Sequence, residues 1–276
     1  MDYDDDPLLG AWYAPSVPRI ADVVCALYED ARRHRKVPRP HKVGFNIKVP
    51  PPYARPWAEH QQRVPVNPFC RAYTSATHNR STLEALRLAG WRMLVSASSK
   101  TRAPGFPYAI DNGAWSAHLH KTPFDTGAFS AILDELGNGA DWVVAPDIVE
   151  GGMASLRLTE TWLPRLVGRI ERVLVAVQDG ITVNDVRPLL AASPREVGIF
   201  LGGSTEWKVA NIPVWAELAE EVGCYYHVGR VNTVKRIRMC RYARAHSFDG
   251  TSPVKFPKSL PLLDNARKEL LPCLPL

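Results

Sequence analysis

The sequence lacks several features that mark membrane, secreted or metal-dependent proteins. None of its 276 residues belongs to an apolar run long enough to cross a bilayer, and the N-terminus has no charged-then-apolar secretion signal. Its five cysteines are scattered, without a C-x-x-C pair or a Cys/His cluster of metal-ligand spacing. We therefore expect a soluble cytoplasmic protein with reduced thiols, no metal, no cofactor and no membrane partner.

Acidic residues are outnumbered, and the resulting formal charge of +6 favours an anionic partner such as nucleic acid. The positive side chains form two clusters, one at residues 32–42 and one at residues 235–244. On a helix, Lys235, Arg238 and Arg241 would lie one turn apart. Solvated helix faces carry similar runs, but the second cluster lies just before Asp249, which favours contact with a nucleic-acid backbone.

Short apolar segments alternate with stretches of helical spacing between residues 71 and 249. Helical spacing is clear at Thr82–Ala89, Phe129–Leu136 and Thr233–Ala243. The alternation predicts an α/β fold with a parallel sheet, and eight units predict a closed (β/α)8 barrel of the TIM type. The apolar segments are Arg71–Ser75, Arg92–Ala97, Tyr108–Asp111, Trp142–Asp147, Val173–Gln178, Val197–Gly202, Tyr225–Gly229 and Ala245–Asp249.

Residues 1–68 differ from the rest of the chain in composition. An acidic start precedes a helix expected from Arg19 to about Arg35, and a proline-rich stretch follows from Pro38 to Pro68. We expect an N-terminal arm over residues 1–68 and a barrel over residues 69–276, with a short C-terminal tail and a helix near Leu262–Leu271. Aromatic residues in the arm could stack on bases, although such residues more often hold a loop against its domain.

Four polar side chains fall where predicted strands end, namely Asp111, Asp147, Gln178 and Asp249. In (β/α)8 barrels the reactive groups gather at the C-terminal ends of the strands. Any one of the three aspartates could instead cap the helix that follows it. The strand ends therefore predict an active site, provided that all four side chains converge.

The motifs around these residues follow one another in a specific order. Asp111 lies in Y-A-I-D-N-G-A-W, Asp147 in V-A-P-D and Gln178 in V-A-V-Q-D-G; F-L-G-G-S-T-E and S-F-D-G-T-S-P follow. In order and wording these five boxes resemble the tRNA-guanine transglycosylase superfamily, whose corresponding boxes line one pocket. The resemblance spans about Tyr73 to Lys255, and helix capping does not account for three aspartates in the family's order.

The sequence departs from the tRNA enzymes in one large respect. Those enzymes carry a zinc-binding subdomain built on three cysteines and a histidine, whereas Cys273 is the only cysteine after Asp249 here. A chain without this subdomain, with D-N-G-A-W, G-G-S-T-E-W-K and S-F-D-G-T boxes, resembles the DpdA-type DNA-guanine transglycosylases, which are common in phages. The resemblance implies two partners, DNA and a free 7-deazaguanine base such as 7-cyano-7-deazaguanine (preQ0), and the host cytoplasm if a phage encodes the protein.

The resemblance also implies catalytic roles. Asp249, in the F-D box, would be the nucleophile that forms a covalent glycosyl-enzyme intermediate at C1′. The departing guanine must gain a proton and the incoming base must lose one, which requires a second carboxylate that alternates between acid and base. Asp111 fits this role. Two displacements at C1′ would retain the configuration of the sugar.

Recognition of guanine calls for groups that match its edge. Asp147 would accept hydrogen bonds from N1 and N2, while Gln178 and the backbone N–H of Gly203 would donate to O6. Gly202 and Gly203 would let the backbone approach the flat base, and Ser204 and Val228 would lie near C7. Lys255 matches a loosely placed phosphate contact, although a surface lysine is the plainer description. Asn112 replaces a small residue of the family box, which alters the expected pocket shape.

Two other functions fit the same sequence. One is a tRNA-guanine transglycosylase that binds tRNA without zinc, and the other is a catalytically silent barrel that binds a nucleobase or nucleic acid. The sequence leaves open the C7 substituent, the strand state of the substrate and the oligomeric state. The histidines match no metal spacing and are interpreted as structural, namely His118, His120, His227 and His246.

Overall fold

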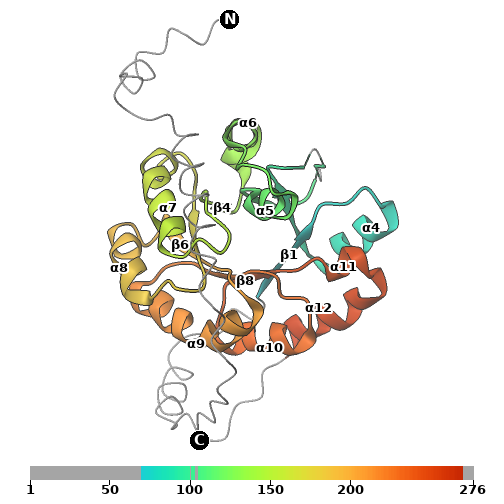
Figure 1. Cartoon of the computed structure of the whole chain (residues 1–276). Helices are drawn as coiled ribbons and strands as arrows, with labels where there is room; N and C mark the ends of the chain where they lie inside the picture. The colour runs from blue at the N-terminus through green and yellow to red at the C-terminus, as the bar shows by residue number, and fades with distance from the viewer. Residues whose placement is uncertain (1–69, 100, 103–104, 270–276) are drawn as a thin grey trace, which may run out of the picture.

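A computed structural model describes residues 70–99, 101–102 and 105–269, which form a closed barrel of eight parallel strands (Figure 1). Each strand pairs with the next one in sequence, and β8 closes the barrel against β1. The predicted (β/α)8 fold is therefore confirmed. The strands are β1 (Arg71–Ser75), β2 (Arg92–Ser96), β3 (Tyr108–Asp111), β4 (Val143–Val144), β5 (Val173–Val177), β6 (Val197–Leu201), β7 (Tyr226–Val228) and β8 (Ser247–Asp249).

Helices surround the barrel and cover the outer faces of its strands (Figure 1). Two expected helical stretches lie within α4 and α6, and the third, Thr233–Ala243, extends one residue beyond each end of α10. The helix expected near Leu262–Leu271 is α12, which begins earlier and ends at Lys268. The helices are α4 (Arg80–Ala89), α5 (Ala114–His120), α6 (Thr126–Leu136), α7 (Met153–Leu166), α8 (Val183–Ala192), α9 (Thr205–Val222), α10 (Val234–Tyr242), α11 (Ser252–Lys255) and α12 (Leu260–Lys268), with 3-10 turns η3 (Gly137–Gly139) and η4 (Pro257–Ser259).

Polar side chains begin several of these helices. The side chains of Asn79, Asp125 and Thr233 each accept a hydrogen bond from a backbone N–H in the first turn of α4, α6 and α10. Such caps satisfy donors that have no partner within the helix. These helices therefore start at fixed points, and α4 and α10 do so a few residues beyond the C-terminal ends of β1 and β7, where the candidate site lies.

Alternation along the strands divides the core into two parts. One cluster fills the barrel interior and includes Tyr73, Ala109, Trp142 and Tyr225, while a larger cluster lies between the strands and the helices. Because side chains on a strand alternate between its faces, a residue two positions after an inward-facing one also faces inward. Ala109 therefore predicts that Asp111 faces the interior.

Some predictions concern residues outside the described part of the chain. These are the N-terminal arm of residues 1–68, with its helix, its basic cluster and its aromatic residues, and the last seven residues, which include Cys273. Among the described cysteines, Cys70, Cys224 and Cys240 are buried free thiols. No described helix combines the length and the apolar character needed to span a membrane.

Candidate active site

Asp249 ends β8 and is only 6% exposed. Its Oδ1 accepts hydrogen bonds from Nε2 of His227 at 3.0 Å and from the backbone N–H of Arg230 at 3.2 Å. The other carboxylate oxygen, Oδ2, has no hydrogen-bond partner among the described residues. One oxygen is thus held in place, while the second remains available to a substrate.

His227 belongs to a hydrogen-bonded chain that ends at this carboxylate. The hydroxyl of Tyr225 donates to Oγ of Ser247 at 2.9 Å, and Oγ lies 2.7 Å from Nδ1 of His227. The serine proton therefore goes to Nδ1, which leaves the imidazole proton on Nε2, facing Asp249. Burial lowers the pKa of His227, and the hydrogen bond to Asp249 opposes that shift. His227 is thus a buried, neutral donor to Asp249; the sequence predicted a structural histidine but not this contact.

Asp111 ends β3 and faces the same space. Its Oδ2 accepts hydrogen bonds from Oγ of Ser96 at 3.2 Å and from the backbone N–H of Gly113 at 3.1 Å. Burial raises the pKa of Asp111 to about 6; the bond from Gly113 opposes this shift, and the charge of Asp249 adds to it. The carboxyl group of Asp111 can therefore take up and release a proton near neutral pH.

Asp147 lies beyond β4 and is oriented by Asn112. The side-chain amide of Asn112 donates to Oδ1 of Asp147 at 2.8 Å and to the carbonyl of Ala145 at 2.7 Å. Burial raises the pKa of Asp147 to about 6, against the effect of the Asn112 bond, and the charge of Asp111 raises it further. Asp111 therefore lies within electrostatic reach of both Asp147 and Asp249. Asn112 positions one of them, which the sequence did not reveal.

The glycine-rich loop after β6 approaches the site closely. Gly203 has a φ of +77°, and a Cβ there would lie 2.6 Å from Oδ2 of Asp179. Only glycine fits this position without strain. Gly202 directly precedes it, and its N–H donates to the carbonyl of Val177 on the neighbouring strand. The backbone at residues 202–203 is thus fixed next to the end of β5, where Gln178 follows.

Gln178 and Ser204 are engaged by protein groups at this rim. The buried amide of Gln178 donates one hydrogen bond to the carbonyl of Ile148 at 2.8 Å and retains a second N–H. The backbone N–H and the hydroxyl of Ser204 both donate to Asp179 at 2.7 Å, and the hydroxyl also caps α9. Ser204 therefore anchors the loop, and its hydroxyl is not free to select a C7 substituent.

Val228 does not lie where the sequence analysis expected it. Its side chain is fully buried and packs in the cluster between the strands and the helices. Its neighbours His227 and Gly229 occupy the inward positions of this segment, because side chains alternate along a strand. A Cβ on Gly229 would lie 2.8 Å from the ring of Phe200 and 3.4 Å from Oδ1 of Asp249. Gly229 and Phe200, and not Val228, therefore lie beside Asp249.

Arg230 extends across the mouth of the site. Its guanidinium group lies 4.5 Å from the ring centroid of Trp115 on α5 and donates to the carbonyl of Gly203. Its own backbone is left-handed, with a φ of +57°, and its N–H binds Asp249. Lys208, which is 1% exposed, holds the adjacent carbonyl of Gly229, and burial lowers the pKa of this lysine to about 8. Sequence reasoning identified neither cation.

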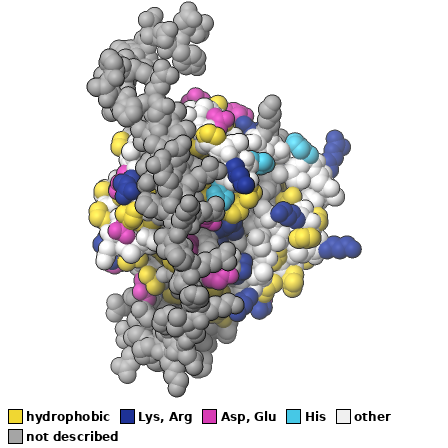
Figure 2. All heavy atoms as spheres, in the orientation of Figure 1, with side chains coloured by type: hydrophobic (Ala, Val, Ile, Leu, Met, Phe, Trp, Pro, Cys, Tyr) yellow, Lys and Arg dark blue, Asp and Glu magenta, His cyan; other side chains and the backbone are white. Residues whose placement is uncertain are grey.

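The four basic residues predicted to contact nucleic acid differ in their exposure and in their partners. Lys235 and Lys255 are exposed. Arg238 forms a double hydrogen bond with Glu269, with N–O distances of 2.7 and 2.8 Å. Arg241 is 7% exposed and donates to the carbonyl of Ala266, so the structure removes it from the candidates, because a buried side chain cannot reach a phosphate. In Figure 2, the visible Lys and Arg side chains are scattered and do not form one patch.

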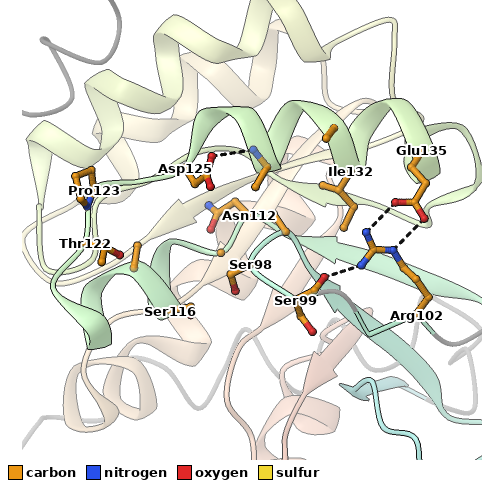
Figure 3. A pocket seen from close by; sticks show the side chains of 15 residues that line it. Ser98, Ser99, Arg102, Asn112, Ser116, Thr122, Pro123, Asp125, Ile132 and Glu135 are labelled. Atoms are coloured by element: carbon orange, nitrogen blue, oxygen red, sulfur yellow. Dashed lines mark hydrogen bonds and ion pairs between the residues drawn. The ribbon is translucent and has the colours of Figure 1, made fainter.

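A recess of about 410 Å³ opens beside Asn112, between α5, α6 and the segment that follows β2 (Figure 3). Asn112 forms part of its wall, so this residue contacts both the recess and Asp147. At the other side Arg102 forms an ion pair with Glu135 and donates to the carbonyl of Ser99. The recess therefore has a mixed polar and apolar lining, and Asn112 connects it to the candidate site.

The described residues include no group of three His, Cys, Asp or Glu side chains that could hold a metal ion. The arrangement instead offers a fixed carboxylate, a carboxyl group that titrates near neutrality and a third carboxylate oriented by an amide. Comparison with known proteins gives no family: a scan against protein-family models found no match to this chain, and a search of the curated proteins found no similar protein.

Proposed function

We propose that the protein is a DNA-guanine transglycosylase, which exchanges guanine in DNA for a 7-deazaguanine base such as 7-cyano-7-deazaguanine. The observation that carries the proposal is the convergence of Asp249, Asp111 and Asp147 at the C-terminal end of the barrel, in three distinct environments. The order of the sequence boxes that contain them supports the same reaction.

In the proposed first step, Oδ2 of Asp249 attacks C1′ of the target nucleotide. The C1′–N9 bond breaks, a C1′–O bond forms, and guanine leaves with a proton from Asp111. His227 stabilises the negative carboxylate through its hydrogen bond to Oδ1 and keeps Oδ2 directed at the sugar. This gives a covalent aspartyl-glycosyl intermediate.

In the second step the incoming base displaces Asp249. Its N9–H proton passes to Asp111, N9 bonds to C1′, and the carboxylate is released. Because one glycosidic bond replaces another, the reaction needs no nucleotide triphosphate, and two displacements retain the configuration at C1′. Asp111 returns to its starting protonation state only after both steps.

The base would be held by its hydrogen-bonding edge. Ionised Asp147, oriented by Asn112, accepts from N1 and N2, and the remaining N–H of Gln178 donates to O6 together with the N–H of Gly203. A 7-deaza base keeps this edge, so one pocket serves both bases. The ring of Phe200, beside Gly229, offers an aromatic surface at the same wall.

DNA is the proposed polymer because the chain is basic and its D-N-G-A-W, G-G-S-T-E-W-K and S-F-D-G-T boxes resemble those of the DNA-directed enzymes. Exposed Lys235 and Lys255 are the proposed backbone contacts, with Arg238 available if its ion pair with Glu269 opens. A guanine within a duplex must be flipped out, at a cost of a few kcal/mol, whereas a single strand avoids this cost.

The test is incorporation of labelled guanine and of labelled 7-cyano-7-deazaguanine into DNA and into tRNA by the purified full chain. We expect exchange into DNA that is lost in Asp249→Ala and retained in Asp134→Ala. Asp134 is a matched control, since it is an exposed aspartate that pairs with Arg169 on the outside of the barrel. Exchange into tRNA alone would replace the proposal with the tRNA activity. Base binding without exchange into either polymer would identify a silent binding barrel.

A further inference from the structure

A second cavity of about 410 Å³ lies at the opposite end of the barrel from Asp249. Its basic side chains stand where strands begin: Arg71 is the first residue of β1, Arg172 directly precedes β5, Arg195 lies just before β6, and His246 directly precedes β8. These four positions belong to strands on different sides of the barrel, so their side chains converge on the N-terminal opening.

The three arginines of this cavity have no acidic partner in the described part of the chain. No carboxylate of these residues lies within ion-pair distance of Arg71, Arg172 or Arg195. By contrast, other arginines of the barrel, such as Arg102 and Arg169, pair with acids. The cavity therefore concentrates positive charge that the described residues leave uncompensated.

Asp141 is the acid whose charge reaches Arg71, but its carboxylate is already engaged. It accepts hydrogen bonds from Arg92 and from the hydroxyl of Tyr73. The hydrogen bond of Arg172 to Asp141 goes to the backbone carbonyl, at 3.4 Å, and not to the carboxylate. The guanidinium groups thus keep most of their donors for a ligand.

Aromatic rings form the wall of the cavity. Tyr225 stacks on His246 with a centroid distance of 4.8 Å, and the guanidinium group of Arg172 lies 4.7 Å from the Tyr225 centroid. Nδ1 of His246 accepts the backbone N–H of Tyr226 at 3.1 Å, so the neutral ring carries its proton on Nε2. Burial, with the charges of Arg172 and Arg71, lowers the pKa of His246. Positive charge here disfavours a further cation and favours an anion.

We propose that this cavity binds the phosphate group of a small phosphorylated molecule, with Arg71, Arg172 and Arg195 as its counter-ions. Planar guanidinium groups match the geometry of phosphate oxygens and bind them in pairs. The volume lies within the range of small-molecule pockets. The proposal does not rest on the transglycosylase reaction, because a base that reaches Asp249 enters from the other end of the barrel.

The test is a calorimetric titration of the full chain with inorganic phosphate, pyrophosphate and a 5′-mononucleotide, at low ionic strength. We expect Arg71→Gln and Arg195→Gln each to weaken binding about tenfold, because each removes charge-assisted hydrogen bonds. Both side chains are exposed, so the variants should fold as the wild type does. Arg80→Gln is the matched control, since it removes an equal charge at the start of α4 and should leave affinity unchanged.

The ring of His246 provides an independent readout by NMR. Phosphate should shift its resonances and raise its pKa, and both effects should be lost in Arg195→Gln. Tighter binding of the mononucleotide than of inorganic phosphate would identify a phosphate ester as the ligand, and equal binding would identify free phosphate. The proposal fails if no phosphate compound binds, if Arg80→Gln weakens binding equally, or if His246 does not respond.

Discussion

The two ends of the barrel differ in the sign of the charged side chains that gather there and in how deeply those side chains are buried. At the C-terminal end three aspartates are largely enclosed, whereas at the N-terminal end Arg71 and Arg195 are exposed. The surrounding helices begin at the C-terminal end of the strands, so their dipoles favour acids there and bases at the other end. The dipoles account for the sign of charge at each end but not for the burial of the acids.

That burial has a cost which the basic end does not bear. Raising the pKa of a carboxyl group from 3.8 to about 6, as at Asp111 and Asp147, corresponds to a destabilisation on the order of 3 kcal/mol at neutral pH. A helix dipole stabilises a favourable charge near the helix end by less than about 1 kcal/mol at an exposed position. The burial of its ionisable groups, more than the sign of their charge, therefore distinguishes the end of the barrel where we propose the reaction takes place.

The largest effect should follow from neutralising Asp111, the proposed proton carrier at the acidic end. Asp111→Asn should lower the rate of exchange by about 10²- to 10⁴-fold, because asparagine can accept the hydrogen bond from Gly113 but cannot transfer a proton. Single-turnover release of guanine from DNA measures the effect, with Asp134→Asn as the control. A loss of less than about threefold would assign the proton transfer to another group.

A smaller effect should follow from removing the donor to the nucleophile. His227→Leu should lower the rate by about 10- to 100-fold, since a hydrogen bond to a charged group contributes about 1.5–3 kcal/mol. His227→Gln retains an N–H at a similar position and should recover most of the rate. The KM for the free base should stay the same in both variants. Equal losses in both would indicate a packing defect and not a lost hydrogen bond.

The pH dependence should divide the reaction into two halves. Asp111 has a raised pKa, so it is protonated below about 6, and guanine release should slow as the pH rises through that value. Base capture should slow as the pH falls through about 6, because Asp111 must accept a proton. Ionised Asp147 holds the base in both half-reactions, so its protonation weakens both at low pH, and only guanine release also slows as the pH rises. The two carboxyl groups are coupled, so the apparent values belong to the pair. Rapid-quench measurement of each half-reaction checks this, and parallel profiles would contradict it.

The smallest expected effect is on the free energy of unfolding, which should depend on pH through Asp147. The folded state binds the Asp147 proton more tightly than the unfolded state, so stability falls as the pH rises from about 4 to about 6. Asp147→Asn removes this loss and should stabilise the protein by about 1–3 kcal/mol at pH 8, with a smaller gain at pH 4. Urea unfolding at both pH values measures the difference. Arg195→Gln, at the exposed basic end, should change stability by less than about 0.5 kcal/mol at either pH.

Much of the fold could be predicted because each strand is a short apolar run with clear limits. The predicted segments Arg71–Ser75 and Tyr108–Asp111 coincide with β1 and β3. The segment Trp142–Asp147 does not, since only Val143–Val144 form the strand. Pro146 has no backbone N–H to donate to a neighbouring strand, which ends the pairing before Asp147. Asp147 therefore depends on Asn112 for its orientation, and no local pattern reveals that contact.

The remaining parts of the site depend on contacts between distant residues. His227 meets Asp249 only because β7 and β8 pair in a register that places His227 opposite Ser247. This register cannot be read from either segment alone. Val228 points outward because side chains alternate along β7 and His227 points inward. Arg241 was judged by its spacing from Lys235, but the packing of α10 on α12 buries it, and this packing is likewise absent from the local sequence.

The chain of hydrogen bonds from Tyr225 through Ser247 and His227 to Asp249 has an evolutionary consequence. Losing the Tyr225 hydroxyl would free Ser247 to turn its proton elsewhere, and His227 could then exchange tautomers and withdraw its donor from Asp249. No single substitution along this chain is neutral for the others. Across descendants of a common ancestor, the four positions should therefore be inherited or replaced as one set, even though they span the barrel from one opening to the other.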